Sequence, residues 1–237
     1  MRLILIRHGQ TPANVLGRLD TAHPGPGLTE RGLEQAAKIP DALRGESIDA
    51  IFASTLTRTQ LTAAPLAADR GLAVTILGGI HEIEAGDLEG KTDMHSVRAY
   101  LEAVFAWGSG DLDAVMPGGP DGHNFFGRFN ADLAEIIGSG LETAVVVSHG
   151  AAIRVWVAGN ATNIEPKFVG EHELMNTGIV ILEGSFDEGW TLLEWESTPV
   201  GGASRRRSGR RPDRRDARRG ARRRLSLYDR PYFLCTA

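Results

Sequence analysis

The sequence predicts an α/β protein in which helices cover both faces of a mostly parallel central sheet. Short apolar runs that are typical of buried strands alternate with longer stretches whose apolar residues recur at helical spacing. Such alternation favours a three-layer α/β/α arrangement. The chain has 237 residues, of which 42% are hydrophobic, and this is enough for one good-sized core. We therefore expect one folded domain.

Six short apolar runs are predicted as strands. They cover residues 3–6, 50–53, 73–77, 143–147, 178–182 and 191–195. The first predicted helix has Thr29 as its N-cap and Glu30 in its first turn, and it continues to Ile39. A second helix follows Ser54, and three later helices are predicted over residues 95–107, 125–137 and 149–158.

The charge of −4 is distributed unevenly along the chain. Residues 1–199 contain 13 Lys and Arg against 27 Asp and Glu, whereas residues 200–237 contain 13 against 3. Between residues 201 and 224 the chain has no apolar period, so this segment cannot bury a core. We predict a folded domain over residues 1–199 and an Arg-rich, disordered C-terminal extension over residues 200–237.

Composition also bears on cellular location. No apolar run approaches the length of a membrane span, and the first residues lead directly into a strand, so we expect no membrane association and no signal peptide. Cys235 is the only cysteine, which excludes an intramolecular disulfide and favours a reducing cytoplasm. No Cys and His cluster has zinc-site spacing, and no cofactor is expected. The oligomeric state stays open, a homodimer included.

The strand over residues 3–6 ends at Arg7 and His8. Ligands of open α/β sheets bind at the carboxyl ends of the strands. A neutral histidine is a good nucleophile toward phosphorus, and an adjacent arginine can hold the phosphoryl oxygens. The pair therefore predicts a site for phosphoryl chemistry.

Two further cationic or donor groups follow strands in the same way. Arg58 lies in the first turn of the helix after Ser54, and His149 follows the strand over residues 143–147. Strand ends of this kind converge on one crevice. Arg7, Arg58 and His149 would then hold a dianionic phosphoryl group, and we expect the helix N-termini to add backbone N–H groups. Because these cations are built in, no metal is required.

A departing alkoxide needs a proton donor, and a carboxyl group suits that role. Residues 81–90 form a loop rich in such groups. Glu82 is the best candidate for the general acid and base, and Glu84 is its main rival. Asp87 and Glu89 are interpreted as solvated loop or capping groups. His81 either touches the substrate or packs against the loop.

Four pieces of the chain carry the expected chemistry, and each lies at a strand end or in a loop. In sequence order they are Arg7-His8, Arg58, the loop over residues 81–90, and His149. Together they resemble the signature of the histidine phosphatase (phosphoglycerate mutase-like) superfamily over roughly residues 2–185. The resemblance implies the three-layer fold of that superfamily. It also implies that His8 is phosphorylated, that Arg7, Arg58 and His149 bind phosphate, and that Glu82 is the acid and base. The expected substrate-binding set is Asn14, Thr11, Gln10 and Gly9.

The stretch Pro117-Gly118-Gly119 is similar to a Pro-Gly-Gly loop of that family. The family pattern usually continues with Glu and Ser, whereas this chain has Pro120 and Asp121. The local substrate contacts of the family are therefore not carried over to this loop.

The resemblance leaves the reaction to be decided between hydrolysis and phosphoryl return. Cofactor-dependent phosphoglycerate mutases of the family carry a long insertion after the Glu loop. Here only 26 residues separate Gly90 from Pro117, and Lys91 and Arg98 are their only cations. We predict metal-independent hydrolysis of a small phosphomonoester, as in the short phosphatase-type branch, with mutase chemistry as the alternative.

A function of another class is suggested by the Arg-rich extension. Its charge could bind a polyanion through phosphate groups. No aromatic residue is interleaved between residues 201 and 224, so sequence-specific RNA reading is not supported. An inert extension and an out-of-frame reading of GC-rich DNA are the remaining interpretations.

Overall fold

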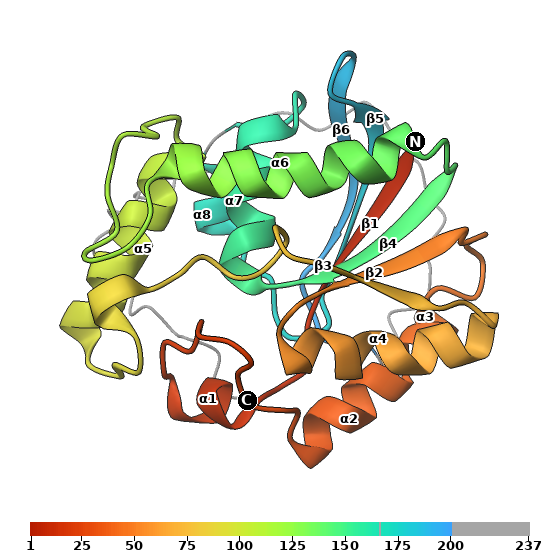
Figure 1. Ribbon diagram of the computed structural model, residues 1–237, viewed down its shortest axis with the longest axis horizontal. Coiled ribbons are helices and arrows are strands. Elements are labelled where there is room, and N and C mark those ends of the chain that lie inside the picture. Colours follow the sequence, from red (N-terminus) through yellow and green to blue (C-terminus); the bar gives the residue numbers. More distant parts are fainter. Residues whose placement is uncertain (166, 201–237) are drawn as a thin grey trace, which may run out of the picture.

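Six strands form one sheet in the order β3-β2-β4-β1-β5-β6 in the computed structural model, which describes residues 1–165 and 167–200 (Figure 1). The strands are β1 (Arg2–Arg7), β2 (Ala50–Ser54), β3 (Val74–Leu77), β4 (Thr143–Ser148), β5 (Ile179–Ser185) and β6 (Gly189–Glu196). Each overlaps one of the six predicted runs. The α/β class is confirmed.

Four of the strands run parallel. β1 pairs in parallel with β4, β4 with β2, and β2 with β3. β5 is antiparallel to β1 and forms a hairpin with β6. The sheet is therefore mixed but mostly parallel, as the alternation of elements predicts.

Helices cover both faces of the sheet, because the buried side chains of the strands alternate between two apolar clusters. Along β1, Leu3 and Leu5 belong to the larger cluster, whereas Ile4 and Ile6 belong to the smaller one. The larger cluster packs under α5 (Met94–Gly108), α6 (Gly122–Gly138) and α7 (Gly150–Asn160). The smaller cluster packs under α3 (Ile39–Ala42) and α4 (Thr57–Arg70), on the opposite side of the sheet in Figure 1, and α2 (Glu30–Ala37) packs against α4.

The helices differ from the predictions mainly where they are short. The single helix predicted from Thr29 to Ile39 divides into α2 and α3, because Pro40 lacks the N–H that would continue the ladder. Short helices were not predicted. They are α1 (Pro12–Leu16), α8 (Phe168–Glu171) and the 3₁₀ turn η1 (Gly86–Leu88).

The last described residue packs with the body of the domain. Val200 is buried in the smaller apolar cluster, and its N–H donates to Thr177 Oγ1 at 3.3 Å. Residues 201–237, and with them the predicted disorder of the Arg-rich extension, lie outside the described residues. The division of the chain at residue 199 stays a prediction.

The order of the strands places the predicted site. β1 and β4 are neighbours in the middle of the sheet and end together at Arg7 and Ser148, which are register partners. β2, on the other side of β4, ends at Ser54, just before α4. His8, Arg58 and His149 therefore emerge from one edge of the sheet.

Candidate active site

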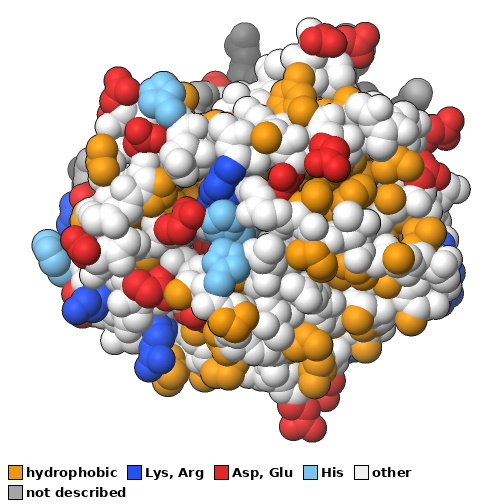
Figure 2. Space-filling view, viewed as in Figure 1, with side chains coloured by type: hydrophobic (Ala, Val, Ile, Leu, Met, Phe, Trp, Pro, Cys, Tyr) orange, Lys and Arg blue, Asp and Glu red, His pale blue; other side chains and the backbone are white. Residues whose placement is uncertain are grey.

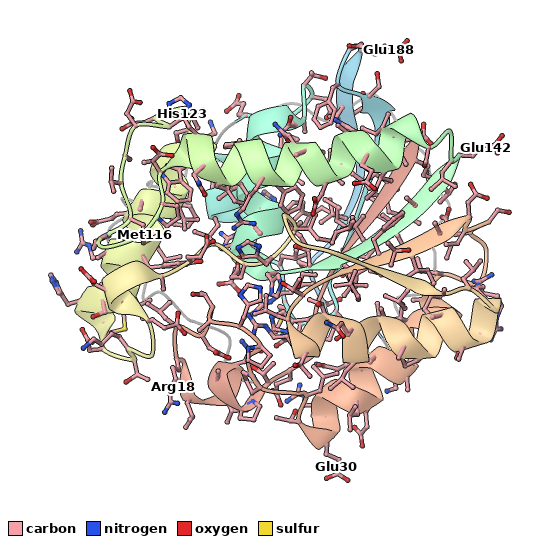
Figure 3. All side chains as sticks on the ribbon, in the orientation of Figure 1. Arg18, Glu30, Met116, His123, Glu142 and Glu188 are labelled. Carbon is pink, nitrogen blue, oxygen red and sulfur yellow. The ribbon has the colours of Figure 1, made fainter. Side chains whose placement is uncertain are left out.

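A cavity of about 140 Å³ lies at this edge of the sheet. Six predicted site residues line it, whereas His149 does not; the six are Arg7, His8, Thr11, Asn14, Arg58 and Glu82. Figure 3 shows nitrogen-bearing side chains gathered between α1, α4 and the loops opposite them, in the middle of the molecule. Residues from β1, α4 and the loop after β3 thus meet around one small space.

His8 is held in the form that a nucleophile needs. Its Nδ1 lies 2.8 Å from the carbonyl oxygen of Gly9, which can only accept a hydrogen bond. The Nδ1 therefore carries the proton of the neutral ring, and the lone pair lies on Nε2. Burial, together with the positive charges of Arg58 and Arg7, lowers the pKa of His8 well below its usual value. The ring is neutral at physiological pH.

The end of β1 that carries His8 is held by residues 176 and 177, which lie just before β5. The N–H of Thr177 donates to the carbonyl oxygens of Arg7 and His8, and the side chain of Asn176 donates to the same His8 oxygen at 3.0 Å. Thr177 has a φ of 57°, which a β-branched residue rarely adopts. The strained backbone at Thr177 allows residues 176 and 177 to place two hydrogen-bond donors on the strand that bears the nucleophile.

Two arginines supply positive charge beside His8. Arg7 Nη1 donates to the carbonyl oxygen of Leu174 at 2.6 Å, and Gly150 leaves room for its guanidinium, since a Cβ there would lie 3.1 Å from Arg7 Nε. Arg58 is only 2% exposed. Its Nη2 donates to the carbonyl oxygen of Asp20, whereas its buried Nη1 has no hydrogen-bond partner among the described residues. Its nearest carboxylate oxygen, Asp20 Oδ2, lies 3.7 Å away, beyond hydrogen-bond distance. A buried cationic N–H without a hydrogen bond indicates a site for an anion.

His149 is fully buried beside His8, with 5.2 Å between the ring centroids. Its Nε2 lies 2.8 Å from Ser54 Oγ, and its Nδ1 has no hydrogen-bond partner among the residues described. Burial, together with Arg58 and His8, lowers the pKa of His149 well below its usual value. In the tautomer whose Nε2 accepts from Ser54 Oγ, the Nδ1–H is a second donor without a hydrogen-bond partner among the described residues.

Glu82 is oriented by the start of α7. Its Oε1 accepts from the N–H of Ala152 at 2.9 Å and from its own neighbour Ile83 at 3.0 Å, and its Oε2 accepts from Ala151 at 3.3 Å. The N-terminus of α7 was expected to offer its N–H groups to the phosphoryl group. Instead, two of them bind Glu82, so this helix end positions a carboxyl group in the cavity.

Glu84 does not line the cavity that Glu82 lines. It pairs with His81 Nε2 at 2.7 Å and with Arg128 Nη2 at 3.2 Å. Burial opposes ionisation of Glu84, but the hydrogen bond from His81 and the charge of Arg128 lower its pKa to about 2. The structure therefore separates the two rivals by location. On the face of the molecule drawn in Figure 2, histidine and acidic side chains lie next to one another near the middle.

The remaining residues of the 81–90 loop act within the protein. His81 uses both ring nitrogens, because its Nδ1 contacts the carbonyl oxygen of Gly78 and its Nε2 contacts Glu84. This arrangement favours the packing interpretation of His81. Glu89 accepts from the backbone N–H groups of Thr21 and Ala22, as expected for a capping group.

The predicted substrate-binding set divides into two pairs. Thr11 and Asn14 line the cavity and cap α1 through reciprocal hydrogen bonds. Asn14 Oδ1 accepts from Thr11 and from Asn176, which leaves its amide nitrogen as the donor for a ligand. Gly9 and Gln10 do not line the cavity. Their backbone N–H groups bind Thr62 and Gln35, on the helices behind the site.

Several lining residues were missed by sequence reasoning. They are Arg18, Leu19, Asp20, Thr21, Val97, Tyr100, Leu101, Arg154 and Leu174, besides small residues of α1 and α7. Arg18, labelled in Figure 3, and Asp20 follow α1, which was itself not predicted. Arg154 had a usable signal, since it lies one helical turn after Gly150. The apolar residues of α5 had none, because they resemble core residues.

The departure from the Pro-Gly-Gly pattern has a local explanation. Asp121 is the N-cap of α6, and its side chain accepts from the N–H of Asn124 at 2.8 Å. Asp and Ser are both favoured N-caps. At this position the aspartate therefore starts a helix.

Among the described residues, no group of three His, Cys, Asp or Glu side chains is arranged to hold a metal ion. No helix in the same part of the chain is long and apolar enough to cross a membrane.

Comparison with known proteins points in one direction. The model of the histidine phosphatase superfamily (branch 1) matches residues 3–198. The PE-PGRS family protein PE_PGRS11 of Mycobacterium tuberculosis is 39% identical over 215 residues, which is 84% of this chain but only 37% of that longer protein. The adenosylcobalamin/alpha-ribazole phosphatase of Escherichia coli is 35% identical over 162 residues, 67% of this chain and 78% of that protein.

A solved structure agrees with these sequence relatives. The mycobacterial glucosyl-3-phosphoglycerate phosphatase in complex with VO3 superposes with a TM-score of 0.70 at 26% identity, over 83% of this chain and 99% of that chain.

Proposed function

Because the chain belongs to the histidine phosphatase superfamily, branch 1, we propose that it hydrolyses a small phosphomonoester through a covalent phosphohistidine on His8. The observation that carries this proposal is the hydrogen bond between His8 Nδ1 and the carbonyl oxygen of Gly9. This bond leaves the Nε2 lone pair of a neutral ring beside two arginines. A neutral imidazole with positive charge next to it suits attack on a dianionic phosphoryl group.

The first step transfers the phosphoryl group from the substrate oxygen to His8 Nε2. Arg7, Arg58 and the Nδ1–H of His149 bind the phosphoryl oxygens, and the amide of Asn14 adds a donor. Glu82 gives its proton to the departing alkoxide. In the second step Glu82 takes a proton from water, water attacks the phosphorus, and His8 is released with inorganic phosphate.

Metal-independence is part of the proposal. Four arginines line the cavity and supply its positive charge, namely Arg7, Arg18, Arg58 and Arg154. We expect turnover to survive treatment with EDTA. Activity that EDTA abolished and a divalent cation restored would contradict this part of the proposal.

The nucleophile is tested by trapping the intermediate. A substrate with a labelled phosphoryl group is mixed with enzyme and quenched in base, where phosphohistidine survives. The wild type should carry a label that acid removes, and His8→Ala should carry none and lose turnover. His123→Ala is the matched control, because the side chain of His123 is 62% exposed, and it should behave as the wild type. Near-normal turnover in His8→Ala would overturn the assignment.

The substrate is found with a panel of phosphomonoesters. The relatives named above direct the first choices to alpha-ribazole phosphate and glucosyl-3-phosphoglycerate. Mutase chemistry is separated in the same assay, because a phosphatase releases inorganic phosphate whereas a mutase returns the phosphoryl group to the organic product.

The proposed location is the cytoplasm, in keeping with a single cysteine, Cys235.

A further inference from the structure

An acidic side chain lies in the pocket beside the arginine that should bind phosphate. Asp20 lines the same cavity as His8, Arg58 and Glu82. Its carbonyl oxygen accepts from Arg58 Nη2 at 2.9 Å, and its Oδ2 lies 3.7 Å from Arg58 Nη1. This Oδ2 is buried and has no hydrogen-bond partner among the described residues. Nothing in the proposed reaction uses this carboxyl group.

An ionised Asp20 would work against the ligand of the pocket. A dianion that binds Arg58 Nη1 must come close to an oxygen that is 3.7 Å from the same nitrogen. Like charges at such short distances in a buried site do not both stay ionised, and one of them takes up a proton. Either Asp20 moves away or it becomes neutral when the anion enters.

The loop that carries Asp20 resists movement. Leu19 exchanges backbone hydrogen bonds with the chain after η1, through Lys91 and Gly90. Thr21 is held by Glu89, and the Thr21 hydroxyl accepts from the N–H of Ala85. Both neighbours of Asp20 are therefore fixed to the loop that also bears Glu82.

The surroundings of Asp20 make its carboxyl group easier to protonate than that of a free aspartate. Burial raises its pKa, the charge of Glu89 raises it further, and Arg58 and Arg18 oppose these effects. The other charged or titratable groups around the cavity come from β1, the loop after β3, α5 and α7. They are Arg7, His8, Glu82, Tyr100 and Arg154.

We propose that Asp20 is a further ligand-binding residue of this pocket, and that it holds a proton while a dianionic phosphoryl group is bound. The neutral carboxyl then donates a hydrogen bond to a phosphoryl oxygen, and binding of the dianion takes up one proton from solvent. This inference rests on the proposed function for the identity of the ligand. Its tests measure binding and need no turnover.

Sulfate is the probe for the first test, because it stays a dianion between pH 5 and 8.5. The dissociation constant of sulfate is measured by titration calorimetry in the wild type, in Asp20→Asn and in Asp113→Asn. Asp113 is the matched control, since its side chain is 94% exposed and does not line the cavity. The wild type and Asp113→Asn should bind more weakly as pH rises through the titration of Asp20.

The Asp20→Asn variant should lose that dependence. At pH 8 it should bind sulfate about tenfold or more tightly than the wild type, because the repulsive carboxylate is gone. Equal affinity of the two proteins at pH 8, with the same pH dependence, would overturn the proposal. It would mean that Asp20 leaves the pocket when an anion enters.

Proton uptake is the second test, and it holds even if Asp20→Asn does not fold. Calorimetry in buffers of different ionisation enthalpy gives the number of protons taken up with sulfate. Since His8, Glu82 and His149 can also take up a proton, the measurement compares the wild type with Asp20→Ala. Uptake that is smaller by about one proton in Asp20→Ala at pH 7.5 supports Asp20, and equal uptake in the two proteins contradicts it. Failure of phosphohistidine trapping would contradict the proposed function and leave these binding results intact.

Discussion

Glu82 and Glu84 stand two residues apart and serve different purposes. The backbone N–H groups of α7 hold Glu82 in the cavity, whereas Arg128 and His81 hold Glu84 outside it. Sequence alone ranks the two by their place in a motif. The structure separates them by the partners of each carboxyl group.

Glu82→Gln should therefore lose turnover by about 10²–10⁴-fold, the usual cost of removing a general acid. The loss should be larger for alkyl phosphates than for aryl phosphates, whose leaving groups need less protonation. Glu84→Gln is the matched control and should keep turnover within a few-fold. Rate constants for both ester types in both variants check the prediction, and equal losses in the two variants would refute it.

Glu84 should instead affect stability in acid. Its pKa of about 2 in the folded protein is below the 4.5 expected for the unfolded chain. A lowered pKa stabilises the fold above pH 4.5, and this contribution is lost as pH falls toward 2. The melting temperature of the wild type should thus drop more steeply over this range than that of Glu84→Gln. Glu188→Gln removes an exposed carboxyl group and is the control, so its melting temperature should fall with pH as that of the wild type does. The same decline of melting temperature in all three proteins would contradict the assignment.

At the scale of single residues, sequence reasoning worked where a polar group ends an apolar strand. Arg7, His8 and His149 stand out for that reason, and the structure brings them together. Asp20 and Arg18 carry no such signal, because they lie in a polar loop whose path depends on tertiary contacts. The use of the α7 N-terminus by Glu82 was also out of reach, since it joins groups almost 70 residues apart.

At the scale of elements, the loop that bears Glu82 depends on one close backbone approach. Gly86 has a φ of 54°, and a Cβ on it would lie 2.2 Å from the carbonyl oxygen of Pro117. Gly90, in the same loop, has a φ of 75° with nothing within 4 Å of its Cβ position. The two glycines share the positive φ and differ in steric contact.

We expect Gly90→Ala to cost about 1–2 kcal/mol of folding free energy, from backbone conformation alone. Gly86→Ala should cost more than this, because the loop must also move away from Pro117. Its turnover should fall as well, since Glu82 and Glu89 lie in the displaced segment. Urea unfolding and steady-state rates of both variants measure the difference, and two variants with equal stability and activity would show that the contact is unimportant.

The longer elements were predictable because their apolar residues follow the helix or strand period, and some helices also have a start signal. The N-cap at Thr29 and the apolar strands are examples. The short helices α1, α3 and α8 contain one turn or little more, too few residues to show a helical period. Their ends are set instead by Thr11 and Asn14, by Pro40, and by packing against the body.

At the scale of the whole molecule, we predict that the acidic domain folds and works without the basic extension, and that the extension binds polyanions. Truncation after Val200 keeps the last buried residue and removes residues 201–237. The melting temperature and the turnover of a small phosphoester should not change, because the described residues contain the whole cavity. Retention on heparin should be lost, since the removed arginines carry the charge that salt screens.

A second variant isolates the charge of the extension. Replacing its arginines between residues 205 and 224 with serine keeps the length, and it should abolish heparin retention as truncation does. Salt should weaken the retention of the wild type. An insoluble or inactive truncated protein would show instead that the extension, through residues 225–234, completes the fold.

The position of β1 in the sheet decides when the site can exist during synthesis. His8 lies near the start of the folded domain, yet β1 pairs with β4 and β5 and with nothing nearer in sequence. The strand that carries Arg7 and His8 can therefore pair only after β4 and β5 have been synthesised, more than 130 and 170 residues later. Pairing over such separations is slow to form. A nascent chain that stops before β5 cannot hold a working catalytic strand, so activity arrives only when synthesis of the domain is almost complete.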